Sequence, residues 1–249
     1  MSPRPFISVI TIVYNDVKHI EQTINSVLEQ EYDNFEYIII DGGSDDGSSQ
    51  IIKRHEEKLF FWASEPDDGI ADAFNKGLEK SNGDWIIFIN SGDTFFSTTV
   101  LSEMLLCLDK KYDLVYGKVV LVDDCGGIIK SSGRDFNQRQ FLRYMTIPHQ
   151  ACFHKASLFK ELGQYDISFK IAMDYEFLLR KKGIEAFFVD ILISRMLIGG
   201  ISQQNEYRVL KEYRRAKLKN MIHGKTKLLV EIEFCFGFAK ALVKKVLFR

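Results

Sequence analysis

The chain has 249 residues, of which 46% are hydrophobic and 27% are charged. This balance is typical of a soluble globular protein and excludes a disordered chain. The length allows a large core that needs neither disulfides nor metals to stabilise it. The formal net charge is −1, so the charge of the whole chain points to no polyanionic partner.

The charges are unevenly distributed along the chain. Residues 206–249 contain twelve basic and four acidic residues, a net charge of +8, whereas residues 1–205 contain 21 basic and 30 acidic residues, a net charge of −9. An acidic body followed by a basic tail suggests different partners for the two parts. Because the tail has no recognised nucleic-acid-binding motif and the body is acidic, we expect no nucleic-acid partner.

The cysteines and the N-terminus indicate the compartment. The four cysteines lie far apart without a CxxC pair, which favours a reducing compartment over a zinc site or a disulfide framework. The N-terminus lacks the basic region of a signal peptide, and no apolar run is long enough to cross a membrane. We therefore expect a cytoplasmic protein, attached at most peripherally to the inner face of the cell membrane.

The first hundred residues alternate between strand and helix patterns. β-branched apolar runs at 7–15, 35–44 and 85–90 predict buried strands. Apolar residues at helical spacing predict helices over 20–30, 48–57, 70–81 and 99–108. This alternation is typical of βαβ units and a parallel sheet.

The pattern changes after residue 110. Residues 112–133 predict a hairpin that turns at 123–127, followed by a helix over 175–182 and a strand over 186–197. The chain is helical, basic and amphipathic from residue 207. The expected fold class is α/β, a Rossmann-like, mixed but mostly parallel sheet flanked by helices. We expect one domain over 1–205, with halves 1–100 and 101–205, and a basic helical tail over 206–249.

Three predicted strands end in polar clusters, at 14–16, 41–47 and 90–93. Turns favour these residue types in any case, so each cluster alone indicates little. In doubly wound sheets, however, ligands bind beyond the carboxyl ends of the strands, and three clusters at one such edge indicate a site.

The sequence excludes several known kinds of nucleotide- and metal-binding motif. The chain contains neither GxxxxGK[ST] nor a GxGxxG fingerprint, and 41–52 does not fit a calcium loop. The clusters instead offer carboxylates without a loop that cradles phosphate. A diphosphate bound there requires a divalent cation, and Mn²⁺ or Mg²⁺ suits such oxygen ligands.

Six segments occur in the order of a known family: SVITIVYN, IIIDGGSDDGS, SEPDDGIADAFNKG, GDWIIFINSGD, PHQACF and MDYEFLLR. The chain resembles the family 2 glycosyltransferases, which have the GT-A fold. SEPDDGIADAFNKG, NSGD and GGIS at 199–202 resemble the branch that builds bacterial exopolysaccharide of the colanic-acid type and O-antigen repeat units. The resemblance implies an inverting transfer of a sugar from a nucleotide diphosphate sugar, UDP-linked or less readily GDP-linked, to a lipid-linked glycan.

The resemblance also implies roles for individual residues. Those expected to bind the nucleotide sugar are Thr11, Val13, Tyr14, Asp41, Asp68, Asp72, Asn75, Lys76, Asn90 and Ser91. The family's metal motif, Asp-x-Asp-Asp, is here Asn90-Ser91-Gly92-Asp93, so Asp93 is the expected metal ligand. Since only one carboxylate remains, intrinsic metal affinity should be weak.

The expected catalytic base is Asp174, which would take the proton of the acceptor hydroxyl. Two alternatives stay open, namely that Asp174 only caps the following helix and that Glu176 is the base. His149 is either structural or faces the acceptor.

The tail and the activity each allow alternatives. The basic segments 211–219 and 240–249 suit an anionic membrane surface, but such a helix can equally pack on the body or on a second subunit in a homodimer. Rival functions are a catalytically inert module that binds sugar nucleotides and a nucleotidyltransferase on the same core.

Overall fold

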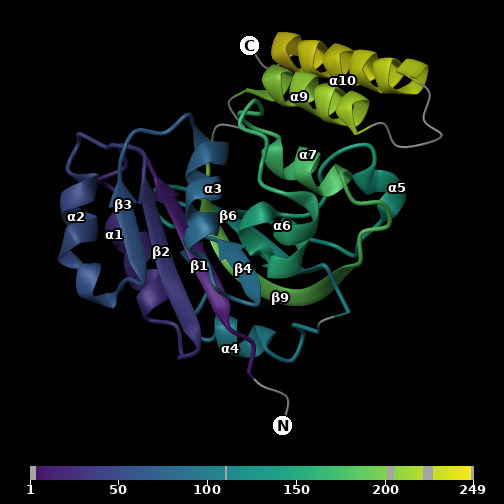
Figure 1. Cartoon of the computed structure of the whole chain (residues 1–249). Helices are drawn as coiled ribbons and strands as arrows, with labels where there is room; N and C mark the ends of the chain where they lie inside the picture. The colour runs from purple at the N-terminus through teal and green to yellow at the C-terminus, as the bar shows by residue number, and fades with distance from the viewer. Residues whose placement is uncertain (1–3, 110, 201–204, 221–226, 248–249) are drawn as a thin grey trace.

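The computed structural model describes residues 4–109, 111–200, 205–220 and 227–247. Within these residues, a mixed sheet of nine strands lies between two layers of helices (Figure 1). The strands are β1 (Ile7–Val13), β2 (Phe35–Asp41), β3 (Phe61–Ser64), β4 (Trp85–Phe88), β5 (Thr94–Phe95), β6 (Leu114–Val122), β7 (Ile128–Ser132), β8 (Cys152–Lys155) and β9 (Ala186–Leu197). The sheet order is β3-β2-β1-β4-β8-β6-β9-β5, and β7 pairs with β6.

The first four strands form the parallel part of the sheet. β1 pairs with β2 on one side and with β4 on the other, so the chain adds strands first in one direction and then in the other. Such a reversal opens a crevice at the carboxyl ends of the two strands concerned. The loops after β1 and β4 therefore border the crevice.

The second half of the sheet is mixed. β8 runs antiparallel to β4 and to β6, whereas β9 runs parallel to β6 and antiparallel to the short β5. This arrangement brings the end of β9 close to the loop between β4 and β5.

Helices cover both faces of the sheet, which is why β1 is buried throughout and mostly apolar. Ile7 and Val9 pack under α1 (Ile20–Leu28), α2 (Ser48–Arg54) and α4 (Val100–Met104). Ile10 and Ile12 face the opposite core. That core is covered by α3 (Ile70–Lys80), α5 (Gln138–Phe141), α6 (Ala156–Leu162) and α7 (Met173–Leu179). A sheet buried on both faces needs continuous apolar strands.

The C-terminal tail forms two helices. α9 (Glu206–Lys219) packs against α7, and its Ala216 belongs to the same core as α7. α10 (Lys227–Leu247) lies outside α9, farthest from the sheet (Figure 1). No helix in the described part of the chain is long and apolar enough to cross a membrane.

The predicted α/β fold class with a mostly parallel sheet is confirmed, and the hairpin turns at 123–127 as expected. The helix expected over 99–108 is limited to α4, and that over 48–57 ends at Arg54 before a 3-10 turn at Glu56–Lys58. β3 and β8 have four residues each, too short for a clear periodic signal. α7 begins at Met173 rather than at 175, which places Asp174 inside its first turn.

Candidate functional site

The loops after β1 and β2 are bonded to each other. Asn15, which adopts the left-handed conformation at φ 50°, donates its backbone N–H to Ser44 Oγ (2.7 Å) and accepts from the N–H of Asp45 (3.0 Å) through its side chain. Asp16 donates its N–H to Ser48 Oγ at 3.0 Å. These bonds fix the rim of the crevice where the first two polar clusters meet.

Asp41 is the last residue of β2 and is fully buried. Its carboxylate accepts hydrogen bonds from the N–H of Ser44 (3.1 Å) and from Ser64 Oγ (2.5 Å). A side chain at Gly42 would place its Cβ 2.5 Å from an Asp67 carboxylate oxygen. Asp41 therefore organises the loop, and a side chain at Gly42 would require Asp67 to move.

The three residues expected at the end of β1 differ in accessibility. Tyr14 is 67% exposed, whereas Thr11 and Val13 are interior. Thr11 Oγ1 donates to the carbonyl of Ile89 at 2.6 Å and lies 2.9 Å from Tyr37 Oη. The side chains of Thr11 and Val13 belong to the core, because β1 is covered on both faces, and their expected place beside the base of a donor stays a prediction.

The segment at the start of α3 carries the next group. Asp72 accepts a hydrogen bond from the N–H of Asp68 at 3.1 Å and pairs with Lys76 at 3.5 Å. Lys76 also lies 3.1 Å from a carboxylate oxygen of Glu65. Burial alone would lower the pKa of Lys76, but these two carboxylates outweigh it and raise the pKa. Lys76 is thus a fully charged cation at the crevice.

Asn75 lies on the same helix but is turned into the protein. It is buried, and its amide both donates to the carbonyl of Tyr165 and accepts from the N–H of Tyr165, each at 2.9 Å. Both ends of the amide are thus used to join α3 to the second half of the domain. These bonds give Asn75 a structural role, and its expected contact with a donor stays a prediction.

The loop after β4 brings two carboxylates together. Ser91 Oγ donates to Asp16 at 2.7 Å, and the side-chain carbonyl oxygen of Asn90 is buried without a partner. Burial raises the pKa of Asp93 to about 8, and the nearby Asp16 raises it further, against hydrogen bonds from the Leu197 backbone and the Gln150 side chain. The sequence placed Asp16 in a predicted polar cluster. It lies near Asp93 because β1 and β4 are neighbours in the sheet.

Asp174 lies in the second half of the domain, in the first turn of α7, and is partly buried. Burial raises the pKa of its carboxyl to about 6, hydrogen bonds from the N–H groups of Asp174 and Tyr175 lower it, and Glu212 on α9 raises it. It does not occupy the N-cap position, which belongs to Ala172. The structure thus places at α7 a carboxylate that changes its charge near neutral pH.

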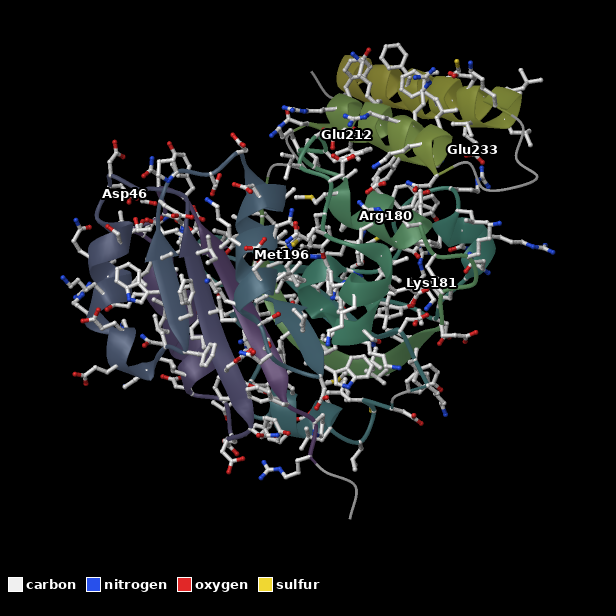
Figure 2. All side chains as sticks on the ribbon, viewed as in Figure 1. Asp46, Arg180, Lys181, Met196, Glu212 and Glu233 are labelled. Carbon is white, nitrogen blue, oxygen red and sulfur yellow. The ribbon has the colours of Figure 1, made fainter. Side chains whose placement is uncertain are left out.

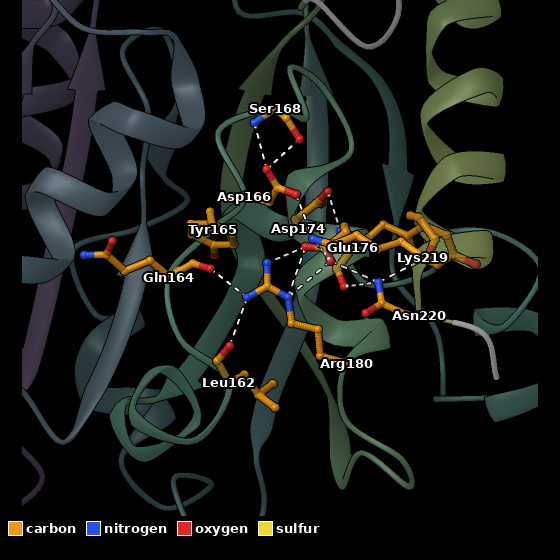
Figure 3. A network of polar contacts seen from close by, with 12 residues as sticks. Leu162, Gln164, Tyr165, Asp166, Ser168, Asp174, Glu176, Arg180, Lys219 and Asn220 are labelled. Atoms are coloured by element: carbon orange, nitrogen blue, oxygen red, sulfur yellow. Dashed lines mark hydrogen bonds and ion pairs between the residues drawn. The ribbon is translucent and has the colours of Figure 1, made fainter. Parts of the chain in front are cut away.

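Glu176 is fully buried in a network of ion pairs (Figure 3). It accepts from Arg180 Nε at 3.1 Å and from Asn220 at 3.0 Å, and lies 2.9 Å from Lys219 Nζ. Burial alone would raise its pKa, but these partners lower it. An enclosed carboxylate with three partners is poorly placed to meet an acceptor, which favours Asp174 over Glu176 as the expected base.

His149 is part of an aromatic cluster. Its ring stacks on Phe88 with centroids 4.8 Å apart, and its Nε2 lies 3.2 Å from Tyr165 Oη. Burial, with a contribution from His154, holds the pKa of His149 well below its usual value. It is therefore a neutral ring at pH 7, and these contacts give it a structural role.

The architecture is the GT-A fold of known glycosyltransferases. TarS of S. aureus in complex with UDP-GlcNAc superposes with a TM-score of 0.67 at 18% identity, covering 94% of this chain and 71% of that one. The mannosyltransferase PcManGT from Pyrobaculum calidifontis, in complex with GDP-Man and Mn²⁺, gives 0.67 at 17% identity over 97% and 76%. This chain spans only 43% of a longer TarS structure.

The chain belongs to glycosyl transferase family 2, whose model matches residues 8–165. An uncharacterized glycosyltransferase of Mycobacterium tuberculosis is 36% identical over 188 residues, 72% of this chain and 70% of that protein. A PGL/p-HBAD biosynthesis glycosyltransferase of Mycobacterium bovis is 25% identical over 82% of this chain and 78% of that protein. The protein is thus an enzyme, a glycosyltransferase.

Proposed function

We propose that the enzyme is an inverting glycosyltransferase that moves a sugar from a nucleotide diphosphate sugar to a hydroxyl of a lipid-linked glycan, in the synthesis of a bacterial surface polysaccharide. The observation that carries this proposal is Asp174, a partly buried carboxylate whose pKa of about 6 leaves it ionised at pH 7 and able to accept a proton. TarS binding UDP-GlcNAc and PcManGT binding GDP-Man support a nucleotide-sugar donor.

The proposed reaction is a single displacement. The acceptor oxygen forms a bond to the anomeric carbon from the face opposite the diphosphate, and the bond between that carbon and the diphosphate oxygen breaks. The bonding electrons leave with the nucleotide diphosphate, and the hydroxyl proton moves to a carboxylate oxygen of Asp174. Attack from the opposite face inverts the anomeric configuration.

The donor would lie in the crevice between β1, β2 and β4. Tyr14, being exposed, supplies a ring on which the base can stack, and Asp41 holds the loop against which the base lies. Lys76 offsets negative charge of the diphosphate, while Asp68 and Asp72 shape the loop that leads to it. Asn90 and Ser91 complete the wall below the sugar.

The residues around Asp93 fit a divalent cation held jointly with the donor. Two carboxylates, Asp93 and Asp16, lie close enough for one to raise the pKa of the other, and the buried carbonyl oxygen of Asn90 has no partner. Within the described residues, no three His, Cys, Asp or Glu side chains form a metal-binding group, so the diphosphate must supply further ligands. Such an ion, Mn²⁺ or Mg²⁺, would stabilise charge on the leaving diphosphate.

We further propose that α10 rests on an anionic membrane, where a lipid-linked acceptor is found. Leu228, Ile232 and Phe236 follow one another at intervals of four residues and are 67%, 42% and 76% exposed. They form an apolar stripe on a tail of net charge +8. An apolar face with basic flanks suits the surface of anionic lipids.

Nucleotide binding and turnover test the proposal. UDP, GDP, dTDP and CDP are each added with and without Mn²⁺, and a nucleotide at a hundredfold excess over its Kd should raise stability by about 2.7 kcal/mol. Asp93→Ala should abolish the Mn²⁺-dependent part, and Asp174→Asn should retain binding but lose release of nucleotide from the sugar donor. Full turnover by Asp174→Asn would overturn its role as the base.

Flotation with lipid vesicles tests the tail. The wild type should float with vesicles that contain phosphatidylglycerol, whereas Phe236→Asp should float several-fold less and keep its nucleotide affinity. Equal flotation of both proteins, or none of either, would exclude α10 as the docking face.

A further inference from the structure

Residues 170–172, the last three before α7, are bonded to the tail through the side chain of Glu212. Glu212 of α9 is 7% exposed and lies on the side of the helix that faces the body (Figure 2). Its carboxylate accepts the backbone N–H groups of Lys170 (3.1 Å), Ile171 (2.8 Å) and Ala172 (2.9 Å). One carboxylate therefore fixes three successive residues that end two positions before Asp174.

One of these bonds satisfies a group that α7 leaves open, the backbone N–H of its N-cap residue. Ala172 is the N-cap residue of α7 and has no side chain that could cap the helix. The first N–H groups of a helix lack internal partners, and a carboxylate at this end is favourable. Hydrogen bonds to an ionised acceptor are also stronger than neutral ones. Glu212 thus determines where the first turn of α7 lies.

Other residues of α9 contact the same stretch of chain. Tyr213 packs on Tyr175 with ring centroids 4.6 Å apart. Arg215 donates to the carbonyl of Ser168 at 3.1 Å, and Lys219 lies 2.7 Å from Asp166. The tail therefore contacts the segment 166–176 along much of its length, and Asp174 lies inside this segment.

The loop fixed by Glu212 also reaches the donor side of the crevice. Lys170, whose N–H is bonded to Glu212, extends its ammonium to the carbonyl of Asp68 at the start of α3. Lys170 Nζ would lie 3.6 Å from a Cβ at Gly69. The loop is thus also anchored to the segment just before α3.

We propose that Glu212 is a positioning residue of the transfer reaction: by holding residues 170–172 it keeps the Asp174 carboxylate where the acceptor proton must be taken. This inference rests on the proposed function, in which Asp174 is the base. It makes α9 a part of the active site rather than a detachable tail.

Glu212 also affects the charge state of Asp174, because it is an acidic group close to it. Among the residues that the structure describes, the other titratable groups that interact with Asp174 are Cys152, Tyr165 and Tyr213. Burial raises the pKa of each of these three groups, so they are neutral at pH 7. On α7 itself, Glu176 is neutralised by Arg180 and Lys219. Glu212, whose own nearby cation is Arg208 at 3.5 Å, is thus the neighbour that brings negative charge.

The test uses the full chain and three variants: Glu212→Ala, Glu212→Gln and the control Glu231→Gln. Glu231 pairs with Arg214 between α9 and α10 and does not touch the loop. Hydrogen exchange of the amides of 170–172, binding of UDP and GDP, and release of nucleotide from UDP-GlcNAc or GDP-mannose with water as acceptor are measured for each protein.

For Glu212→Ala we expect amide exchange in 170–172 at least tenfold faster, and nucleotide release roughly ten- to a hundredfold slower, because small displacements of a reacting group have effects of this size. Nucleotide affinity should stay within twofold. Glu212→Gln, which keeps an acceptor but no charge, should lose less activity and shift the acidic limb of the pH–rate profile to lower pH. The control should match the wild type in all three measurements.

Faster exchange with unchanged nucleotide release would refute the positioning role. If Glu212→Ala does not fold, Glu212→Gln decides alone, and faster exchange of the amides of 170–172 with wild-type nucleotide release would refute the inference. Failure of the proposed function looks different, because the wild type itself would then neither bind a nucleotide nor release one from either donor.

Discussion

Replacing Asp174 by asparagine should remove the proposed base and, at the same time, stabilise the fold at neutral pH. Burial raises the pKa of this carboxyl from its ordinary 3.8 to about 6, so the native state disfavours the ionised form. At about 1.36 kcal/mol for each pKa unit, ionisation costs the wild-type fold about 3 kcal/mol above pH 7. Asparagine carries no charge and keeps the oxygen that accepts the N–H of Tyr175 at 2.7 Å.

The pH dependence of this gain follows from the sign of the pKa change. Between pH 4 and 6 the native protein binds more protons at Asp174 than the unfolded chain does, so stability falls as the pH rises. The advantage of Asp174→Asn over the wild type should therefore be about 3 kcal/mol at pH 7.5 and about 1 kcal/mol at pH 4.5. Urea unfolding followed by tryptophan fluorescence measures both values.

Asp166 provides the matched control in the same stretch of chain. Burial alone would raise its pKa, but hydrogen bonds from Lys219 and Ser168 outweigh this and lower it. Asp166→Asn should thus destabilise the protein at pH 7.5, opposite in sign to Asp174→Asn. An Asp174→Asn variant that is no more stable than the wild type, or whose advantage is equal at the two pH values, would refute the view that burial is what tunes Asp174.

Four further measurements follow from the site. Wild-type nucleotide release should fall about tenfold between pH 7 and pH 5, as the base with a pKa of about 6 becomes protonated. Glu176→Gln should destabilise the fold by about 3 kcal/mol in urea unfolding, because a buried network loses its anion. Tyr14→Ala should weaken nucleotide binding about tenfold with unchanged melting temperature, since its ring is 67% exposed. Gly77→Ala should lower stability by about 1–2 kcal/mol, because its Cβ would lie 2.6 Å from Ile10 Cγ2.

Much of the fold could be predicted because its main elements carry strong local signals. β1, β2 and β9 are long apolar runs, and α1 and α3 have apolar residues at helical spacing. The polar ends of β1, β2 and β4 do meet at one edge, since neighbouring parallel strands end together. The predicted location of the site depended on this geometry alone.

The roles of single side chains were harder to predict, because they depend on partners far away in sequence. Asn75 is bonded to Tyr165, ninety positions further on. Asp174 and Glu176 both carry a carboxyl group and lie two residues apart, yet only Glu176 forms an ion pair with Lys219 of the tail. Sequence spacing can tell a buried structural carboxylate from a reactive one only when its partner is close in sequence. Arg180, four residues after Glu176, is such a partner.

The sequence left open whether the tail docks on a membrane or packs on the body, and its two helices differ in this respect. α9 packs on the body, where Glu212 is bonded to the loop before Asp174, whereas α10 turns its apolar stripe outward. Arg214 and Glu231 join the two helices at 2.7 Å. Under the proposals above, a lipid-linked acceptor would be delivered to the same two-helix unit that holds the base. Membrane docking and positioning of Asp174 therefore do not compete, because they use opposite faces of the tail.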